Sequence, residues 1–177
     1  AADLEGLTPL MRAARDGAGE RAVRLLVEAG AKVDYCGMES KTALHRAAQF
    51  GHRDPARTLV SLKADINAVD SWGFTPVCFA AQNGHAEVVE ALGLLRADVN
   101  IPASNGCTPL YIASENSHLA VVEALGRLKA DVNTPSNDGC TPLFMACFKG
   151  HLAVVEALVR LKADVNTPSN DGCTPLF

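Results

Sequence analysis

The sequence contains few aromatic residues, and its hydrophobic residues are mostly small. Aromatic residues make up 5% of the 177 residues, with a single tryptophan, although hydrophobic residues make up 48%. Most of that fraction is Ala, Val and Leu, which suit closely packed helices rather than one large core. The net charge is −4, so we expect no surface that binds nucleic acid through its phosphates. Because no apolar run approaches the roughly 20 residues of a membrane-spanning helix, we expect no membrane insertion.

The sequence is organised instead by a period of 33 residues. The motif Thr-Pro-Leu or a close variant recurs at spacings of 34, 33, 33, 33 and 33. Gly-His and Ala-Asp-(Val/Ile)-Asn recur at the same step, and residues 127–144 are repeated letter for letter as residues 160–177. Such self-similarity is typical of a repeat protein. The threonines that begin the motif are Thr8, Thr42, Thr75, Thr108, Thr141 and Thr174.

Each period is predicted to form two short helices followed by a turn. In residues 138–170, Thr141 can cap a helix whose first position is Pro142. Gly150 can end that helix in the left-handed region, and a second amphipathic helix follows over roughly residues 152–161. One such pair cannot bury its own apolar face, but stacked pairs can. The sequence therefore predicts an all-α solenoid in which each repeat contacts its neighbours.

Thr-Pro-Leu, Gly-His, Val-Val-Glu-Ala-Leu and Ala-Asp-Val-Asn at this period resemble the ankyrin repeat over essentially the whole chain. The resemblance implies stacked antiparallel helix pairs with β-hairpin or finger-like turns. It also implies protein binding by the concave face and the finger tips, and no catalysis. We expect a single ankyrin-repeat domain spanning residues 1–177. Its repeats are placed at approximately residues 4–37, 38–70, 71–103, 104–136 and 137–169, with a partial sixth at residues 170–177.

Two positions depart from the family pattern. The usual histidine after Thr-Pro-Leu remains only as His45, so apolar packing should replace the polar network that this residue supplies. The replacements are Met11, Cys78, Tyr111, Phe144 and Phe177. The glycine that usually ends the second helix remains only as Gly30. Either its replacements adopt a left-handed conformation at some cost, or the helix ends differently; they are Lys63, Arg96, Lys129 and Lys162.

The last copy stops at Phe177, just after its Thr-Pro-Leu, so the chain is expected to be part of a longer array. The last helix pair should then expose an apolar end that includes parts of Val154, Leu158 and Leu161. We expect self-association through this end, or easy loss of the last repeat, because terminal repeats normally carry a polar cap.

No residue set indicates catalysis, a metal or a cofactor. His85, His118 and His151 recur one repeat apart, and stacked helices lie roughly 8–10 Å apart. Metal–nitrogen bonds are about 2 Å, so this row cannot share an ion. The recurring cysteines are likewise too far apart for disulfides, and reduced cysteines fit the cytoplasm or the nucleus.

One modification is suggested by the family resemblance. The asparagine of each Ala-Asp-(Val/Ile)-Asn motif lies in a context that resembles the one hydroxylated by an asparaginyl hydroxylase of ankyrin repeats. The alternative is a turn residue that only bonds the backbone. These asparagines are Asn67, Asn100, Asn133 and Asn166.

In a solenoid the framework repeats and the binding site does not, so positions that vary between repeats are informative. Phe50, Trp72 and Phe74 are large apolar groups at positions that need no core filler, and aromatic residues anchor interfaces. Basic residues nearby could pair with acidic groups, which suggests a groove over the first three repeats for a partner mixing apolar and acidic residues. The alternative is that Phe50 and Phe74 pack between repeats, and Phe79 is expected to pack. The full candidate set is Arg12, Arg15, Lys41, Arg46, Gln49, Phe50, Trp72, Phe74, Gln82, Asn83, Glu115 and Asn116.

The leading functional hypothesis is a protein–protein interaction module, acting as a scaffold or adaptor. A second is the substrate-recruiting segment of a multidomain enzyme such as a kinase or ubiquitin ligase. A third is the cytosolic array of a channel or a cytoskeletal tether.

Overall fold

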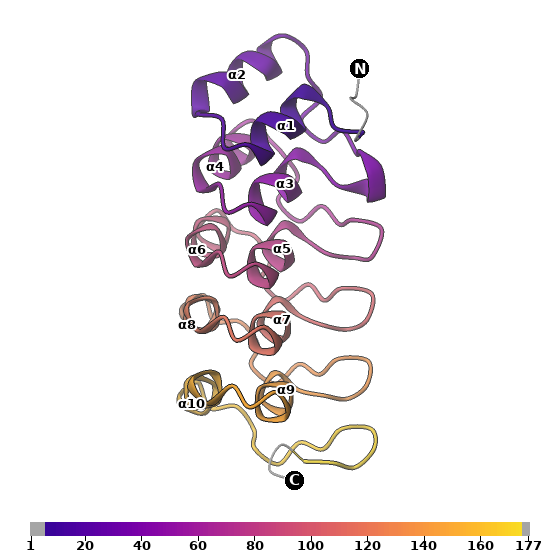
Figure 1. The fold of residues 1–177 in the computed structure, drawn as a ribbon, viewed down its shortest axis with the longest axis vertical. Coiled ribbons are helices and arrows are strands. Elements are labelled where there is room, and N and C mark those ends of the chain that lie inside the picture. The colour runs from indigo at the N-terminus through magenta and orange to yellow at the C-terminus, as the bar shows by residue number, and fades with distance from the viewer. Residues whose placement is uncertain (1–5, 175–177) are drawn as a thin grey trace.

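The computed structural model describes residues 6–174, in which the helices form one elongated stack (Figure 1). That part of the chain contains ten α-helices, one 3-10 turn and no β-strand, which confirms the all-α prediction. The elements are α1 (Pro9–Arg15), α2 (Glu20–Glu28), η1 (Met38–Ser40), α3 (Ala43–Gln49), α4 (Arg53–Ser61), α5 (Pro76–Gln82), α6 (Ala86–Leu94), α7 (Pro109–Glu115), α8 (Leu119–Arg127), α9 (Pro142–Phe148) and α10 (Leu152–Arg160).

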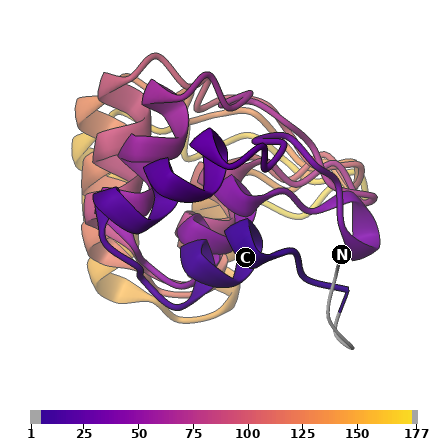
Figure 2. The same ribbon diagram turned by 90° about the horizontal axis from the view of Figure 1, so that it is seen from above.

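The helices form two columns. Each odd-numbered helix packs on the next odd-numbered helix and on its own even-numbered partner, and the even-numbered helices pack on one another. Between an even-numbered helix and the next odd-numbered one, the chain extends sideways as a finger (Figures 1 and 2). We call the surface of the odd-numbered helices and fingers the inner face, and the surface of the even-numbered helices the outer face.

The start of each odd-numbered helix follows from its sequence. The side chain of Thr141 accepts a hydrogen bond from the backbone of Phe144 at 3.1 Å, and Pro142 occupies the first turn, where an N–H would have no helical partner. The same threonine cap begins α1, α3, α5 and α7. Gly150, at φ 73°, follows α9 in the left-handed region, as predicted.

The ends of the even-numbered helices show which alternative holds for the residues that replace the usual glycine. The residues that replace the usual glycine all adopt the left-handed conformation: Lys63 at φ 72°, Arg96 at 75°, Lys129 at 61° and Lys162 at 65°. The helices therefore end as the family pattern requires, but with side chains in a conformation that disfavours a Cβ.

Apolar packing replaces the polar network at the histidine position. Cys78 and Tyr111 are buried, and with Cys107 and Ile112 they form a small apolar cluster beside the main core of Ala, Val and Leu. Burial raises the pKa of the Cys107 thiol to about 11, so this thiol stays protonated at neutral pH. Phe177, the last of the replacements, lies outside the described residues.

The predicted apolar end is wrong in two of its three residues. Val154 and Leu158 are fully buried, at 0% exposure, because the side of α10 that carries them packs against α8 and α9. Leu161 is half-buried, as expected. The apolar exposure at this end comes from other residues, Phe148 at 74%, Leu152 at 69% and Val159 at 50%.

Candidate partner-binding face

The inner face of the first three helix pairs carries an aromatic and cationic cluster. The ammonium of Lys41 lies 5.4 Å from the ring centroid of Trp72 and 4.9 Å from that of Phe79. The Trp72 finger is fixed by the buried Asp70, whose carboxylate accepts hydrogen bonds from the backbone N–H groups of Trp72 and Phe74, both at 2.9 Å. These bonds fix the backbone of the finger, the Lys41 ammonium lies over the indole, and Trp72 remains 50% exposed. A preorganised aromatic ring of this kind can contribute contact area to a partner with little loss of side-chain freedom.

The other aromatic residues divide between packing and exposure. Phe79 is buried and contacts both His45 and Phe74 with ring centroids 5.7 Å apart, so the prediction that it packs is confirmed. Phe74 is half-buried against the core, which matches the packing alternative. Phe50 is 47% exposed at the end of α3, so its ring is available on the surface.

The predicted basic residues already have intramolecular contacts. Lys41 pairs with Glu39 at 2.6 Å, Arg15 with Asp16 at 2.9 Å, and Arg46 donates from Nη1 to the side chain of Gln49 at 3.1 Å. The side chains of Lys41 and Arg15 are only 12% and 24% exposed, so a partner carboxylate would have to displace Glu39 and Asp16 to reach them.

His45 is buried next to this cluster, and both of its ring nitrogens lie within hydrogen-bonding distance of backbone groups. Its Nδ1 accepts from the backbone N–H of Thr42 at 3.1 Å, and its Nε2 lies 3.0 Å from the carbonyl oxygen of Phe74. The hydroxyl oxygen of Thr42 also lies 2.9 Å from Nδ1. Burial is the largest cause that lowers the pKa of His45 from 6.5; Lys41 also lowers it, while Asp70 and the Phe74 carbonyl oppose the shift.

The lowered pKa of His45 makes the folded state more stable at higher pH. Between the lowered pKa of the folded state and 6.5, the unfolded chain binds a proton at His45 more readily than the folded chain does. The contribution of neutral His45 is therefore present above the unfolded value. It is lost as the pH falls from about 6.5 toward the folded value.

The remaining candidates lie at the opposite ends of the inner helices. The side-chain amide of Asn83 donates to the carbonyl of Phe79, and that of Asn116 to the carbonyl of Ile112, both at 2.8 Å, so both asparagines cap their helices. The backbone carbonyls of Gln82 and Glu115 meet the next repeat's histidines. The sequence did not predict this link between repeats. It joins residues 36 apart at about 3 Å: His85 with Gln49, His118 with Gln82, and His151 with Glu115.

The structure thus separates the candidate set into groups. Lys41, Trp72 and Phe74 form one cluster beside the fingers. Arg46 and Gln49 lie within α3, and Phe50 lies at its C-terminal end, away from that cluster. Arg12 and Arg15 lie on α1, next to α3. The four candidates at the ends of α5 and α7 stand apart from the cluster.

One exposed aromatic residue was missed. Phe148 on α9 is 74% exposed and stacks on Phe144, with centroids 6.5 Å apart and rings tilted by 9°. The sequence carried a signal for it, because Phe148 occupies one of the variable positions, seven residues after Thr141.

The described residues contain neither a metal-binding cluster nor a helix that could span a membrane. Between residues 6 and 174, no three or more His, Cys, Asp or Glu side chains are grouped so that they could hold a metal ion. No helix in this range combines the length and the apolar character needed to cross a bilayer.

Stacked helix pairs with projecting fingers define a helical repeat solenoid with an extended surface for partners. The chain belongs to the ankyrin-repeat family: the family described as ankyrin repeats (three copies) matches residues 1–70, 62–136 and 128–177. Ankyrin repeats are in general protein-interaction modules.

Similar curated proteins are much longer than this chain. Cortactin-binding protein 2 of Rattus norvegicus is 41% identical over 71 residues, which is 40% of this chain and 4% of that protein. SH3 and multiple ankyrin repeat domains protein 2 of Homo sapiens is 35% identical over 72 residues, 41% of this chain and 4% of that protein. Serine/threonine-protein kinase 12 of Arabidopsis thaliana is 34% identical over 74 residues, 42% of this chain and 16% of that protein. The chain therefore corresponds to a small part of each of these relatives.

Proposed function

We propose that this chain is a scaffold or adaptor module that binds a partner protein through the inner face and finger tips of its first three helix pairs. The observation that carries this proposal is the half-exposed Trp72, fixed on its finger by Asp70 and placed over Lys41. Tryptophan is enriched among residues that dominate binding energy.

The exposed aromatics lie toward opposite ends of one inner helix, so a single extended segment of a partner can reach both. Phe50 and Trp72 flank opposite ends of α3, whose seven residues span about 10 Å. Three to four residues of extended chain cover that distance at about 3.3 Å each. The basic residues beside them favour acidic groups between the apolar anchors of such a segment.

Peptide selection on the folded chain tests the location. Peptides are selected from a displayed library against the wild-type chain. Their affinity should fall at least about tenfold with Trp72→Ala and with Phe50→Ala, since each change removes a side chain that the bound partner would bury, worth about 1.4 kcal/mol or more. Phe148→Ala is the matched control, because it removes an exposed aromatic ring elsewhere on the inner face. Circular dichroism checks that each variant is folded. Equal binding by wild type and both test variants would refute the site.

The finer organisation is also part of this proposal. We assign one domain to residues 1–177, with five repeats between residues 4 and 169 and the start of a sixth in 170–177. The chain is assigned no enzymatic activity of its own. Its six free cysteines support a reducing compartment, the cytoplasm or the nucleus.

A second candidate function is recruitment within a longer polypeptide. It is favoured by the match to serine/threonine-protein kinase 12, of which the similar segment is 16%. Association between copies through α10 is a further proposal, supported by the exposed Leu152 and Val159.

A further inference from the structure

The outer face carries a ladder of polar contacts between successive helices. In each step a residue of one even-numbered helix meets the residue 37 positions later, which is one repeat plus one helical turn. Three steps of this ladder are bonded: Arg24 with Ser61 at 3.3 Å, Glu90 with Arg127, and Glu123 with Arg160 at 3.6 Å.

The remaining step, between α4 and α6, is interrupted. Here Arg57 stands in the position that Glu90 and Glu123 occupy in later helices, and its counterpart 37 residues on is Leu94. Leu94 cannot bond a guanidinium, and it is 77% exposed. The equivalent positions in the other even-numbered helices are all polar: Glu28, Ser61, Arg127 and Arg160.

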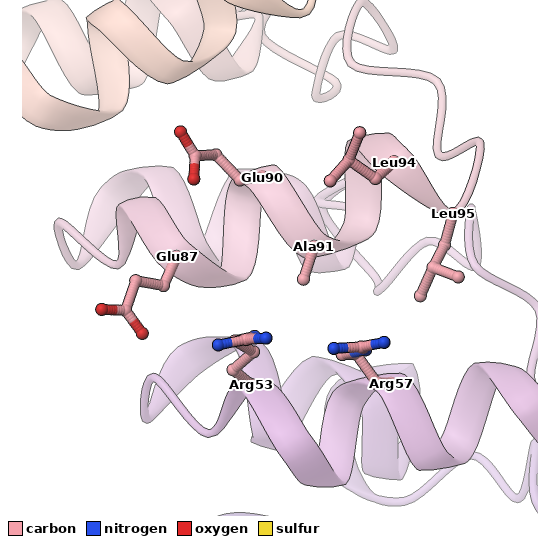
Figure 3. Close-up of a pocket in the computed structure, with 7 residues that line it drawn as sticks. All are labelled: Arg53, Arg57, Glu87, Glu90, Ala91, Leu94 and Leu95. Carbon is pink, nitrogen blue, oxygen red and sulfur yellow. The ribbon is translucent and has the colours of Figure 1, made fainter.

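A hollow of about 320 Å³ lies at this interruption (Figure 3). The guanidinium groups of Arg53 and Arg57 lie between α4 and α6, and Leu94 and Leu95 line the same hollow. Leu95 is 37% exposed, whereas the leucines at equivalent positions, Leu62, Leu128 and Leu161, pack against the core. Two apolar side chains and two cations are therefore exposed together.

The charge in the hollow is not balanced from within. Among residues 6–174, neither Arg53 nor Arg57 has an ion pair within 4.0 Å. Glu90 is turned away from them and paired with Arg127, so Glu87 is the acidic side chain left beside two guanidinium groups (Figure 3). Arginine presents a planar set of donors that matches a carboxylate.

We propose that this hollow is a second docking site, on the outer face, for a partner peptide in which a glutamate or aspartate lies next to a large apolar residue. The partner carboxylate bonds Arg57 and Arg53, and its apolar neighbour covers Leu94 and Leu95. The site is separate from the inner face, so the chain can hold two partners at once.

A variant that completes the ladder tests this assignment. Arg57→Glu combined with Leu94→Arg recreates the Glu90–Arg127 pair one repeat earlier. The change removes the Arg57 guanidinium and the exposed Leu94 from the hollow. The probe is a displayed library of random short peptides, selected on the Trp72→Ala, Phe50→Ala chain so that inner-face binding does not contribute. Selected peptides should carry an acidic residue beside a large apolar one and should bind the ladder-completed variant at least about tenfold more weakly.

The controls separate docking from a change in the framework. Arg160→Leu breaks the ladder two steps further along, at the Glu123–Arg160 pair, which does not line the hollow, and it should leave peptide affinity unchanged. Thermal unfolding should find the ladder-completed variant at least as stable as its parent. The site is overturned if no peptide is retained, if the selected peptides lack the acidic and apolar pairing, or if the ladder-completed variant binds them equally. Failure at Trp72 and Phe50 would instead refute the inner-face site alone.

Discussion

The left-handed residue after each outer helix gives a stability prediction that can be worked out in numbers. Lys129 follows α8 at φ 61°, with an exposed side chain. A non-glycine residue in this conformation costs about 1–2 kcal/mol. Lys129→Gly removes that cost but adds about 0.4–1 kcal/mol of unfolded-state freedom. It also removes a cation near a helix C-terminus, worth about 0.3 kcal/mol when exposed. The net expectation is stabilisation by about 0.5 kcal/mol.

Urea denaturation of Lys129→Gly and Lys129→Ala separates these contributions. The alanine variant loses the same cation but keeps the left-handed Cβ, so it should be less stable than the glycine variant by about 0.8 kcal/mol. Arg96→Gly, at φ 75°, should behave in the same way. A glycine variant no more stable than the alanine variant would refute the attribution of strain to these residues.

Three further predictions concern single side chains. Because burial lowers the pKa of His45, the stability difference between pH 7.5 and 5.5 should shrink in His45→Gln; urea midpoints at the two pH values measure it, and equal differences would contradict the assignment. Iodoacetamide followed by mass spectrometry should label the exposed Cys36 and Cys173 first and Cys78 last, because burial raises the pKa of the Cys78 thiol and shields it. Rapid labelling of Cys78 in the folded chain would be the contrary result. Gly139→Ala should destabilise the chain more than Gly172→Ala. Both glycines have φ near 78°, but only at Gly139 would a Cβ meet the neighbouring finger, 2.4 Å from the side-chain oxygen of Asn170. Thermal melts that give equal losses of stability would exclude a steric contribution.

The sequence could predict the parts of this fold that depend on near neighbours along the chain. Thr141 and Pro142 start α9 because a cap and a proline act on the next few backbone groups, and that prediction is confirmed. The burial of Phe79 also followed from its place in the repeat.

The errors and omissions arise where a residue meets the next repeat. The period of 33 identifies equivalent positions, but it does not say which residue of one repeat faces which residue of the next. His118 meets Gln82 across 36 residues, and Glu90 meets Arg127 across 37. The burial of Val154 was missed for the same reason, since it depends on how α10 lies on α8 and α9.

The duplicated stretch, residues 127–144 and 160–177, separates local effects from contacts between repeats within one molecule. Gly139 and Gly172 have the same sequence around them and nearly the same φ, 77° and 79°, so the finger conformation is local. Cys140 is nonetheless half-buried and Cys173 exposed, because only the first of the two fingers has a described finger stacked beyond it. The hollow at Arg57 follows the same logic. Arginine and leucine are ordinary residues on an outer helix, and they become a candidate site only because Leu94 lies where the next helix should supply a polar partner. A candidate site of this kind therefore depends on a residue pair across a repeat boundary: comparing residues 33 apart shows that Leu94 is the exception, and comparing residues 37 apart shows that Arg57 is the residue it leaves without a partner across the ladder.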